Sequence, residues 1–155
     1  MGADVRVRWA DVEAEAPDLA ALVRAVFQAG TNKTLATLRA DGAPRISATE
    51  CEFGEDVTLG MMPGSVKLRD VLRDPRVALH SPTLEPPSDL SAWVGDAKLA
   101  GRLVAIPRPV GDGPTGAWFA LDVAQVVHTC VDEAARELVV TTWHPGRGVE
   151  RVRRE

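Results

Sequence analysis

The sequence predicts a mainly β fold of the α+β class: a six- to seven-stranded antiparallel barrel with an N-terminal helix and a short inserted helix. Three observations lead to this prediction. An apolar stripe at helical spacing precedes residue 30, short strand-like runs separated by turn signals follow it, and one short basic helix interrupts those runs. An open sheet of this many strands would leave edges to protect, so we expect the strands to close into a barrel.

Length and composition indicate one globular domain, spanning residues 1–155. Hydrophobic residues make up 45% of the chain and charged residues 26%, both ordinary values for a globular protein. The formal net charge of -4 argues against a general nucleic-acid binder. There is no apolar run of the ~20 residues that a membrane span needs, and the N-terminus lacks the pattern of a secretory signal. Cys51 and Cys130 are far apart, and a cytoplasmic location with reduced thiols is expected.

The N-terminal helical segment comprises residues 1–30, with the helix itself predicted over 9–30. Asp11 suits a cap of the first turn, Pro17 suits a first helical position, and Gly30 is a natural stop. The apolar stripe consists of Leu19, Leu22, Val23, Val26 and Phe27. We expect this helix to pack on a sheet and to carry no chemistry.

Strand-like runs occupy most of the remaining chain. The first three are joined by short turn sequences, which predicts an antiparallel meander. All seven expected strands lie at residues 34–40, 45–53, 57–62, 77–81, 97–106, 118–131 and 137–143. The last eleven residues, 145–155, are expected to form a basic tail, which is either solvated or lies over a bound anion or a partner subunit.

The most informative stretch runs from Gly60 to Arg76, a strand end followed by a turn and a short basic helix. Ser65 is a good N-cap, and the free N–H groups of the first turn, together with Lys67, favour a phosphate or carboxylate. The apolar face of this helix is predicted to contain Leu68, Val71 and Leu72, with the basic side chains pointing elsewhere. A serine-capped surface helix with solvated charges is the simpler alternative.

Other motifs give weaker signals. The Gly-x-Gly-x-x-Gly spacing at residues 111–116 contains a proline and precedes a strand, so we interpret it as a loop and not as a dinucleotide-binding turn. His80, His128 and His144 lack the spacing of a metal site, and no metal is predicted. No Gly-x-Ser-x-Gly elbow supports hydrolase chemistry.

The order of motifs resembles the pyridoxamine 5'-phosphate oxidase-like family of FMN-binding split barrels. The matching features are Arg45-Ile46-Ser47 on the second strand, Gly60-Met61 at the end of the third, and Ser65-Val66-Lys67 opening a helix that ends before Asp74-Pro75. The resemblance covers residues 31–106 by motif and the C-terminal strands more loosely. It implies a split β-barrel.

The resemblance also implies a function and a set of site residues. Two identical chains would pair and bind FMN at their interface, and hydride would pass to or from a small organic substrate. The residues implied to hold the phosphate are Arg45, Ser65 and Lys67, and those implied to border the ring and ribityl chain are Thr49, Gly60 and Met61. No catalytic residue is assigned.

Departures from the family pattern keep alternatives open. Glu50 and Val66 stand where the true oxidases carry basic residues, and Met61 replaces a polar neighbour of the ring, so pyridoxamine phosphate is a doubtful substrate. The branch using the deazaflavin coenzyme F-420 is the close alternative, with Arg69, Arg73 or the tail arginines meeting its acidic tail. A cofactor carrier without turnover and a haem-binding split barrel are further alternatives.

Overall fold

The computed structural model of the protein describes residues 5–109, 116–132, 134 and 136–155. The first five residues of the glycine motif, 111–115, and Glu133 of the predicted turn lie outside this part. Among the described residues, no helix combines the length and the apolar character that a membrane span requires. Cys51 and Cys130 are both free thiols.

The N-terminal segment forms two helices instead of the one predicted over 9–30. Helix α1 spans Trp9–Glu15 and α2 spans Pro17–Gln28. The break falls at Ala16, whose φ of -136° and ψ of 63° are not helical, because a following proline disfavours the α region. Pro17 does begin a helix, as expected. Of the predicted stripe, Leu22 is 50% exposed, whereas its other members are buried.

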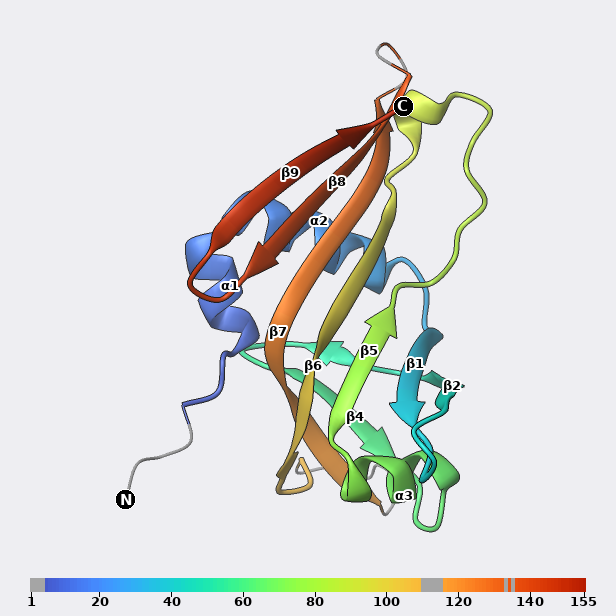
Figure 1. Cartoon of the computed structure of the whole chain (residues 1–155), viewed down its shortest axis with the longest axis vertical. Helices are drawn as coiled ribbons and strands as arrows, with labels where there is room; N and C mark the ends of the chain where they lie inside the picture. The colour runs from blue at the N-terminus through green and yellow to red at the C-terminus, as the bar shows by residue number, and fades with distance from the viewer. Residues whose placement is uncertain (1–4, 110–115, 133, 135) are drawn as a thin grey trace.

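The described residues form one antiparallel sheet of nine strands and a third helix (Figure 1). The strands are β1 (Lys33–Leu38), β2 (Pro44–Thr49), β3 (Glu52–Phe53), β4 (Val57–Met61), β5 (Arg76–His80), β6 (Asp96–Ile106), β7 (Ala117–Asp132), β8 (Glu137–His144) and β9 (Gly148–Arg154). Helix α3 is Val66–Arg73, and Leu90–Ala92 form one 3₁₀ turn. The main path of the sheet runs β2-β1-β5-β6-β7-β4-β3.

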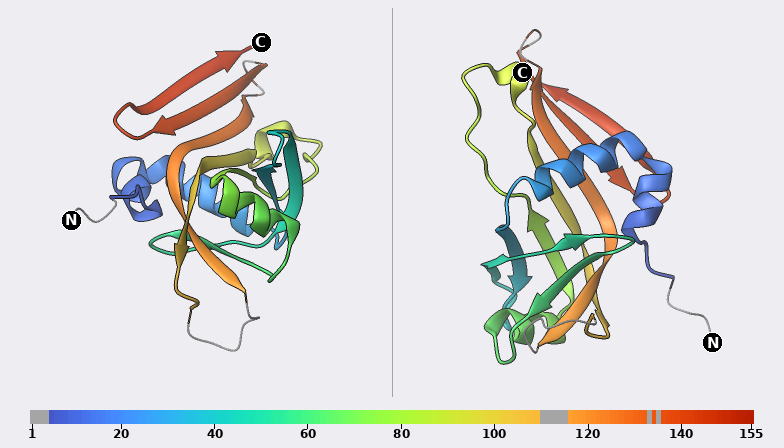
Figure 2. Two further views of the ribbon diagram at one scale, coloured as in Figure 1. Left: turned by 60° about the horizontal axis from the view of Figure 1, so that its bottom comes forward. Right: turned by 180° about the vertical axis from the view of Figure 1, so that it is seen from behind.

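The strand predicted at 45–53 closes the barrel. It is two strands, because the ladder is interrupted at Glu50 and Cys51: β2 pairs with β1, and β3 pairs with β4. The two ends of the sheet path are thus consecutive in the chain, and the sheet curves round between them (Figure 2). The predicted antiparallel pairing of the three consecutive runs is confirmed, but the middle run is broken into β2 and β3, and β4 has the distant strand β7 as its second neighbour.

The predicted basic tail is largely a strand. Residues 148–154 form β9, which pairs with β8 from Leu138↔Arg154 to His144↔Gly148. The turn between them uses left-handed backbone at Gly146 and Gly148, with φ of 76° and 69°, a conformation that glycine adopts without strain. The division of the predicted strand 45–53 into β2 and β3, together with the additional strand β9, raises the number of strands from the seven predicted to nine. The α+β barrel class is confirmed.

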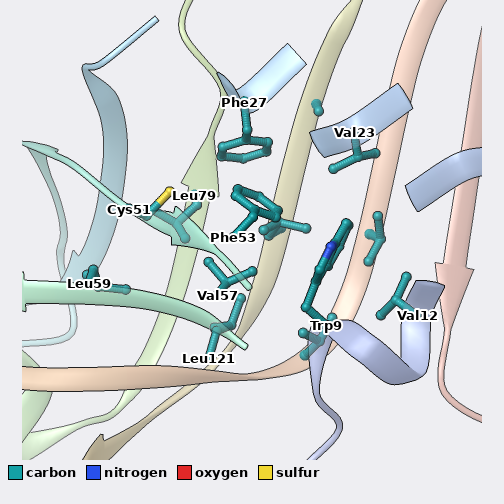
Figure 3. Packing of buried hydrophobic residues seen from close by; sticks show 14 of the residues in the cluster. Trp9, Val12, Val23, Phe27, Cys51, Phe53, Val57, Leu59, Leu79 and Leu121 are labelled. Atoms are coloured by element: carbon teal, nitrogen blue, oxygen red, sulfur yellow. The ribbon is translucent and has the colours of Figure 1, made fainter. Parts of the chain in front are cut away.

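The core lies between the two N-terminal helices and the curved sheet (Figure 3). Phe53 lies at its centre, with ring centroids 5.0 Å from Trp9 and 5.3 Å from Phe27. Edge-to-face and tilted contacts of this kind stabilise aromatic clusters beyond their area burial. The short strand β3 is therefore fixed to both helices, and the interruption at Glu50 and Cys51 lies beside the start of β1, because Lys33 pairs with Thr49.

Candidate functional site

Helix α3 lies at one end of the barrel, and its first turn is built as predicted (Figure 1). Ser65 is the N-cap, and its hydroxyl accepts a hydrogen bond from the Leu68 N–H at 3.4 Å. Val71 is buried, but Leu72 is 69% exposed, so its predicted place on the apolar face was wrong. The buried neighbour of Val71 on this helix is the charged residue Asp70, and it determines which face of α3 meets the barrel.

Asp70 anchors α3 to the first two strands. Its side chain is 3% exposed and accepts hydrogen bonds from the Thr37 hydroxyl at 2.7 Å, the Arg45 Nε at 2.7 Å and the Arg73 Nη2 at 3.0 Å. Burial opposes ionisation of this carboxyl, but the three donors outweigh burial and lower its pKa from 3.8 to about 2. Asp70 is therefore a carboxylate at neutral pH. Arg45, which the resemblance assigns to a phosphate, is its ion-pair partner in this structure.

A cavity of about 1030 Å³ opens beside the first turn of α3. Four of the seven predicted site residues line it: Thr49, Gly60, Met61 and Lys67. The other three, Arg45, Ser65 and Arg69, are not among its lining residues; Arg69 is exposed on α3. The cavity thus brings together residues from β2, β4 and α3, and the cofactor roles of all seven residues stay predictions.

Lys67 is the cation that the first turn of α3 presents to the cavity. Its Nζ donates to the carbonyl oxygen of Ala48, on β2, at 2.8 Å. Partial burial lowers the pKa of its ammonium group. No carboxylate in the described part of the chain forms an ion pair with it, so its charge is available to an anion in the cavity.

Trp118 forms an aromatic wall that the sequence reasoning did not find. Gly60 and Trp118 lie opposite each other in the β4–β7 ladder, and a Cβ on Gly60 would stand 3.1 Å from the indole ring. The glycine therefore lets the ring lie close against the backbone of β4. Because β4 and β7 are distant in sequence, only their predicted pairing could have placed Trp118 here.

The connection from α2 to β1 also lines the cavity, and it was missed as well. Its contribution to the lining is Gln28, Ala29, Gly30, Thr31, Asn32 and Lys33. The interruption between β2 and β3 adds Glu50, the residue that departs from the family pattern, and Cys51. Burial raises the pKa of the Cys51 thiol to about 11, so this cysteine is a neutral thiol at physiological pH.

None of the three histidines lines the cavity. His80 contacts the carbonyl oxygen of Ser81 at 2.6 Å, His128 that of Val94 at 2.8 Å, and His144 the side-chain amide of Gln125 at 3.2 Å. Within the described ranges, no group of three or more His, Cys, Asp or Glu side chains is arranged to hold a metal ion.

Comparison with known proteins gives structural relatives only. No family model matches the chain, and no curated protein matches it. A pyridoxamine 5'-phosphate oxidase-related, FMN-binding protein from Nostoc punctiforme superimposes with a TM-score of 0.59, covering 93% of this chain and 94% of its own, at 12% identity. The chain has the fold of the FMN-binding split barrels. The fold resemblance expected from the motifs is confirmed.

Two further structures with similar folds are named for other cofactors. An F-420 reductase matches with a TM-score of 0.50 and 15% identity over 65% of this chain and 92% of its own. The haem storage protein HutZ from Vibrio cholerae matches with a TM-score of 0.52 and 12% identity over 70% of this chain and 89% of its own. At these identities the shared property is the split-barrel fold, so the choice of cofactor has to be argued from the residues of this chain.

Proposed function

We propose that this split barrel is an oxidoreductase that binds FMN in the cavity beside α3 and passes hydride to or from a small organic substrate. The observation that carries the proposal is the position of Lys67. Its ammonium group extends from the capped first turn of α3 into the cavity without a carboxylate partner among the described residues. A helix N-terminus with a lysine in its first turn favours a phosphate.

The remaining lining fits a flat ring system attached to that phosphate. Gly60 and Met61 provide a strand edge free of bulky polar groups, and the indole of Trp118 provides a flat apolar surface. The cavity volume of about 1030 Å³ lies at the upper end of the usual range for small-molecule sites. There is room for a cofactor and for part of a second molecule.

When bound, FMN would supply the hydride chemistry, and the side chains of this chain would bind, orient and exclude water. Lys67 would fix the phosphate end, which leaves the ring end against Met61 and Trp118. Leu59, which is 1% exposed, closes the apolar side behind them. We infer that a second copy of the chain covers the solvent side, so that the site becomes a dimer interface.

A deazaflavin is the second candidate, and Arg69 is the observation that favours it. This arginine is exposed on α3, two residues after Lys67, and its side chain forms no ion pair within the described ranges. Arg73 and Arg153, by contrast, are held by Asp70, Asp132 and Glu137. Arg69 is therefore the arginine of α3 best placed to meet the acidic tail of a deazaflavin.

A cofactor titration tests the proposal. Purified protein is expected to be yellow, or to bind added FMN at micromolar concentration; tighter binding of the deazaflavin would favour the second candidate. Failure of both to bind at micromolar concentration overturns the proposal. The loaded protein is then mixed with quinone and enone acceptors. Reoxidation of reduced cofactor by an acceptor is expected for an enzyme, whereas binding without turnover indicates a carrier.

A further inference from the structure

Lys33 is a buried cation in the lining of the same cavity. It is 8% exposed, and it lies at the start of β1, opposite Thr49 of β2 in the ladder. The chain contains only three lysines, at positions 33, 67 and 98, and two of them line this cavity. Lys98 is exposed on β6 and serves as a natural comparison.

The ammonium group of Lys33 has hydrogen bonds but no counter-ion. Its Nζ donates to the carbonyl oxygens of Gly30 at 2.8 Å and Thr31 at 3.0 Å, at the end of α2. An ammonium group has three N–H donors, so these contacts leave one donor unused. No carboxylate of the described residues forms an ion pair with Lys33. A buried cation without an opposite charge is costly, and an anionic ligand would remove that cost.

The ammonium groups of Lys33 and Lys67 have different hydrogen-bond partners, although both lysines lie beside neighbouring residues of β2, Thr49 and Ala48. Lys67 belongs to α3 and contacts β2, whereas Lys33 is held by the connection between α2 and β1. The two lysines share the cavity lining with two acidic residues, Glu50 and Glu52, both exposed. This balance of charge favours a group with a single negative charge at Lys33 over a second phosphate.

We propose that Lys33 binds a carboxylate of the substrate, so that the substrate class is a small organic acid. The inference rests on the proposed function, in which the cofactor phosphate occupies the Lys67 side of the cavity. The carboxylate would accept the third N–H of Lys33, next to the neutral thiol of Cys51. The hydrophobic part of the substrate would then extend toward the apolar wall formed by Met61 and Trp118.

Benzoate and its neutral analogue benzamide test this proposal in the protein with and without FMN. Binding is followed by tryptophan fluorescence, because Trp118 lines the cavity. We expect the unmodified protein to prefer benzoate by about tenfold or more, as for a charge-assisted hydrogen bond. This comparison requires no variant. Equal affinity for benzoate and benzamide overturns the proposal.

Three matched variants assign the preference to a residue. Lys33→Met is expected to lose the benzoate preference, whereas Lys67→Met and Lys98→Met keep it in cofactor-free protein. Lys33→Met should also keep its FMN affinity within about threefold. Loss of the preference in Lys67→Met alone overturns the assignment, and loss of FMN binding in Lys33→Met shows that the anion belongs to the cofactor. A third outcome separates the two proposals. If FMN does not bind but the preference for benzoate over benzamide depends on Lys33, the proposed function fails and the anion site at Lys33 stands.

Discussion

Two charged residues of α3, Lys67 and Asp70, have opposite environments although they are three positions apart. Asp70 faces the barrel and is satisfied by Thr37, Arg45 and Arg73, while Lys67 faces the cavity and meets only a backbone carbonyl. Removing one member of a buried ion-pair network leaves an uncompensated charge and destabilises the fold, whereas a cation without a partner carboxylate is available to a ligand. This contrast separates a structural role for Arg45 from a binding role for Lys67.

The Asp70 network predicts a pH-dependent contribution to stability. Because the pKa of Asp70 is lowered to about 2 in the folded protein, its contribution is fully present above the unfolded pKa near 4 and is lost as pH falls toward 2. Asp70→Asn should lower the free energy of unfolding at pH 7 by about 2–3 kcal/mol, less than for a fully buried pair because Arg73 is partly exposed.

Urea denaturation of both proteins at pH 7 and pH 2.5 measures this effect. The difference in the free energy of unfolding between wild type and Asp70→Asn should be smaller at pH 2.5 than at pH 7. Glu85→Gln, a change at an exposed loop residue, is the control and should leave stability unchanged at both pH values. An Asp70→Asn variant as stable as the wild type at pH 7 would remove the network from the forces that hold α3.

Lys67→Ala tests the phosphate role. If FMN binds as proposed, the loss of one charge-assisted hydrogen bond should weaken cofactor binding by about 1.5–3 kcal/mol. The free energy of unfolding without cofactor should change little, because the ammonium group of Lys67 donates one hydrogen bond, to the Ala48 carbonyl. Isothermal titration with FMN measures the affinity, and Lys98→Ala is the matched control. Unchanged affinity would exclude Lys67 from the site.

At the scale of elements, one irregularity separates the barrel from its extension. The register of the β6–β7 ladder shifts between Ala100 and Gly101, with one extra residue, Ala124, on β7. A Cβ on Gly101 would overlap the carbonyl oxygen of Asp122. β-Bulges bend a strand and increase its twist, and here β7 continues past the bulge to pair with β8 (Figure 1).

Gly101→Ala should therefore destabilise the protein by about 1–3 kcal/mol, the usual cost of forcing extra atoms into a packed site. Thermal unfolding followed by circular dichroism measures the loss. The matched control is Gly54→Ala, where a Cβ would make an ordinary contact at 3.9 Å with the Asp56 carbonyl. Equal melting temperatures for the two variants would show that the bulge can shift at no cost.

Local chemistry explains which elements the sequence predicted. The Ser65 cap and the helix after it follow from nearby residues, and so do the turn signals between the early strands. Strand β9 was missed because its many arginines resemble a solvated tail, although backbone pairing with β8 needs no apolar side chains. Trp118 and Lys33 were missed because their places in the cavity depend on pairing between distant strands and on where α2 ends.

At the scale of the molecule, large apolar side chains are exposed on several elements, and three of the most exposed lie on β2, after β4 and on α3. Ile46 on β2 is 74% exposed, Met62 after β4 is 70% exposed, and Leu72 on α3 is 69% exposed. Apolar side chains that form a contiguous exposed patch mark an interface, and a second chain lying over the cavity mouth would cover Met62, which lines it. This observation supports the proposed dimer, in which a second chain would cover the open side of the cavity.

The dimer and the cofactor site should therefore be lost together. Ile46→Glu places a charge on the proposed interface and should convert a particle of twice the chain mass of 16.6 kDa into a monomer. If the partner completes the site, FMN affinity should fall by about tenfold or more in the monomer, because one wall of the site is missing. Sedimentation velocity with and without FMN measures both quantities in one experiment. Val5→Glu, at a residue 95% exposed on the N-terminal segment, is the control and should remain dimeric. A monomeric variant that binds FMN as tightly as the wild type would place the whole site within one chain.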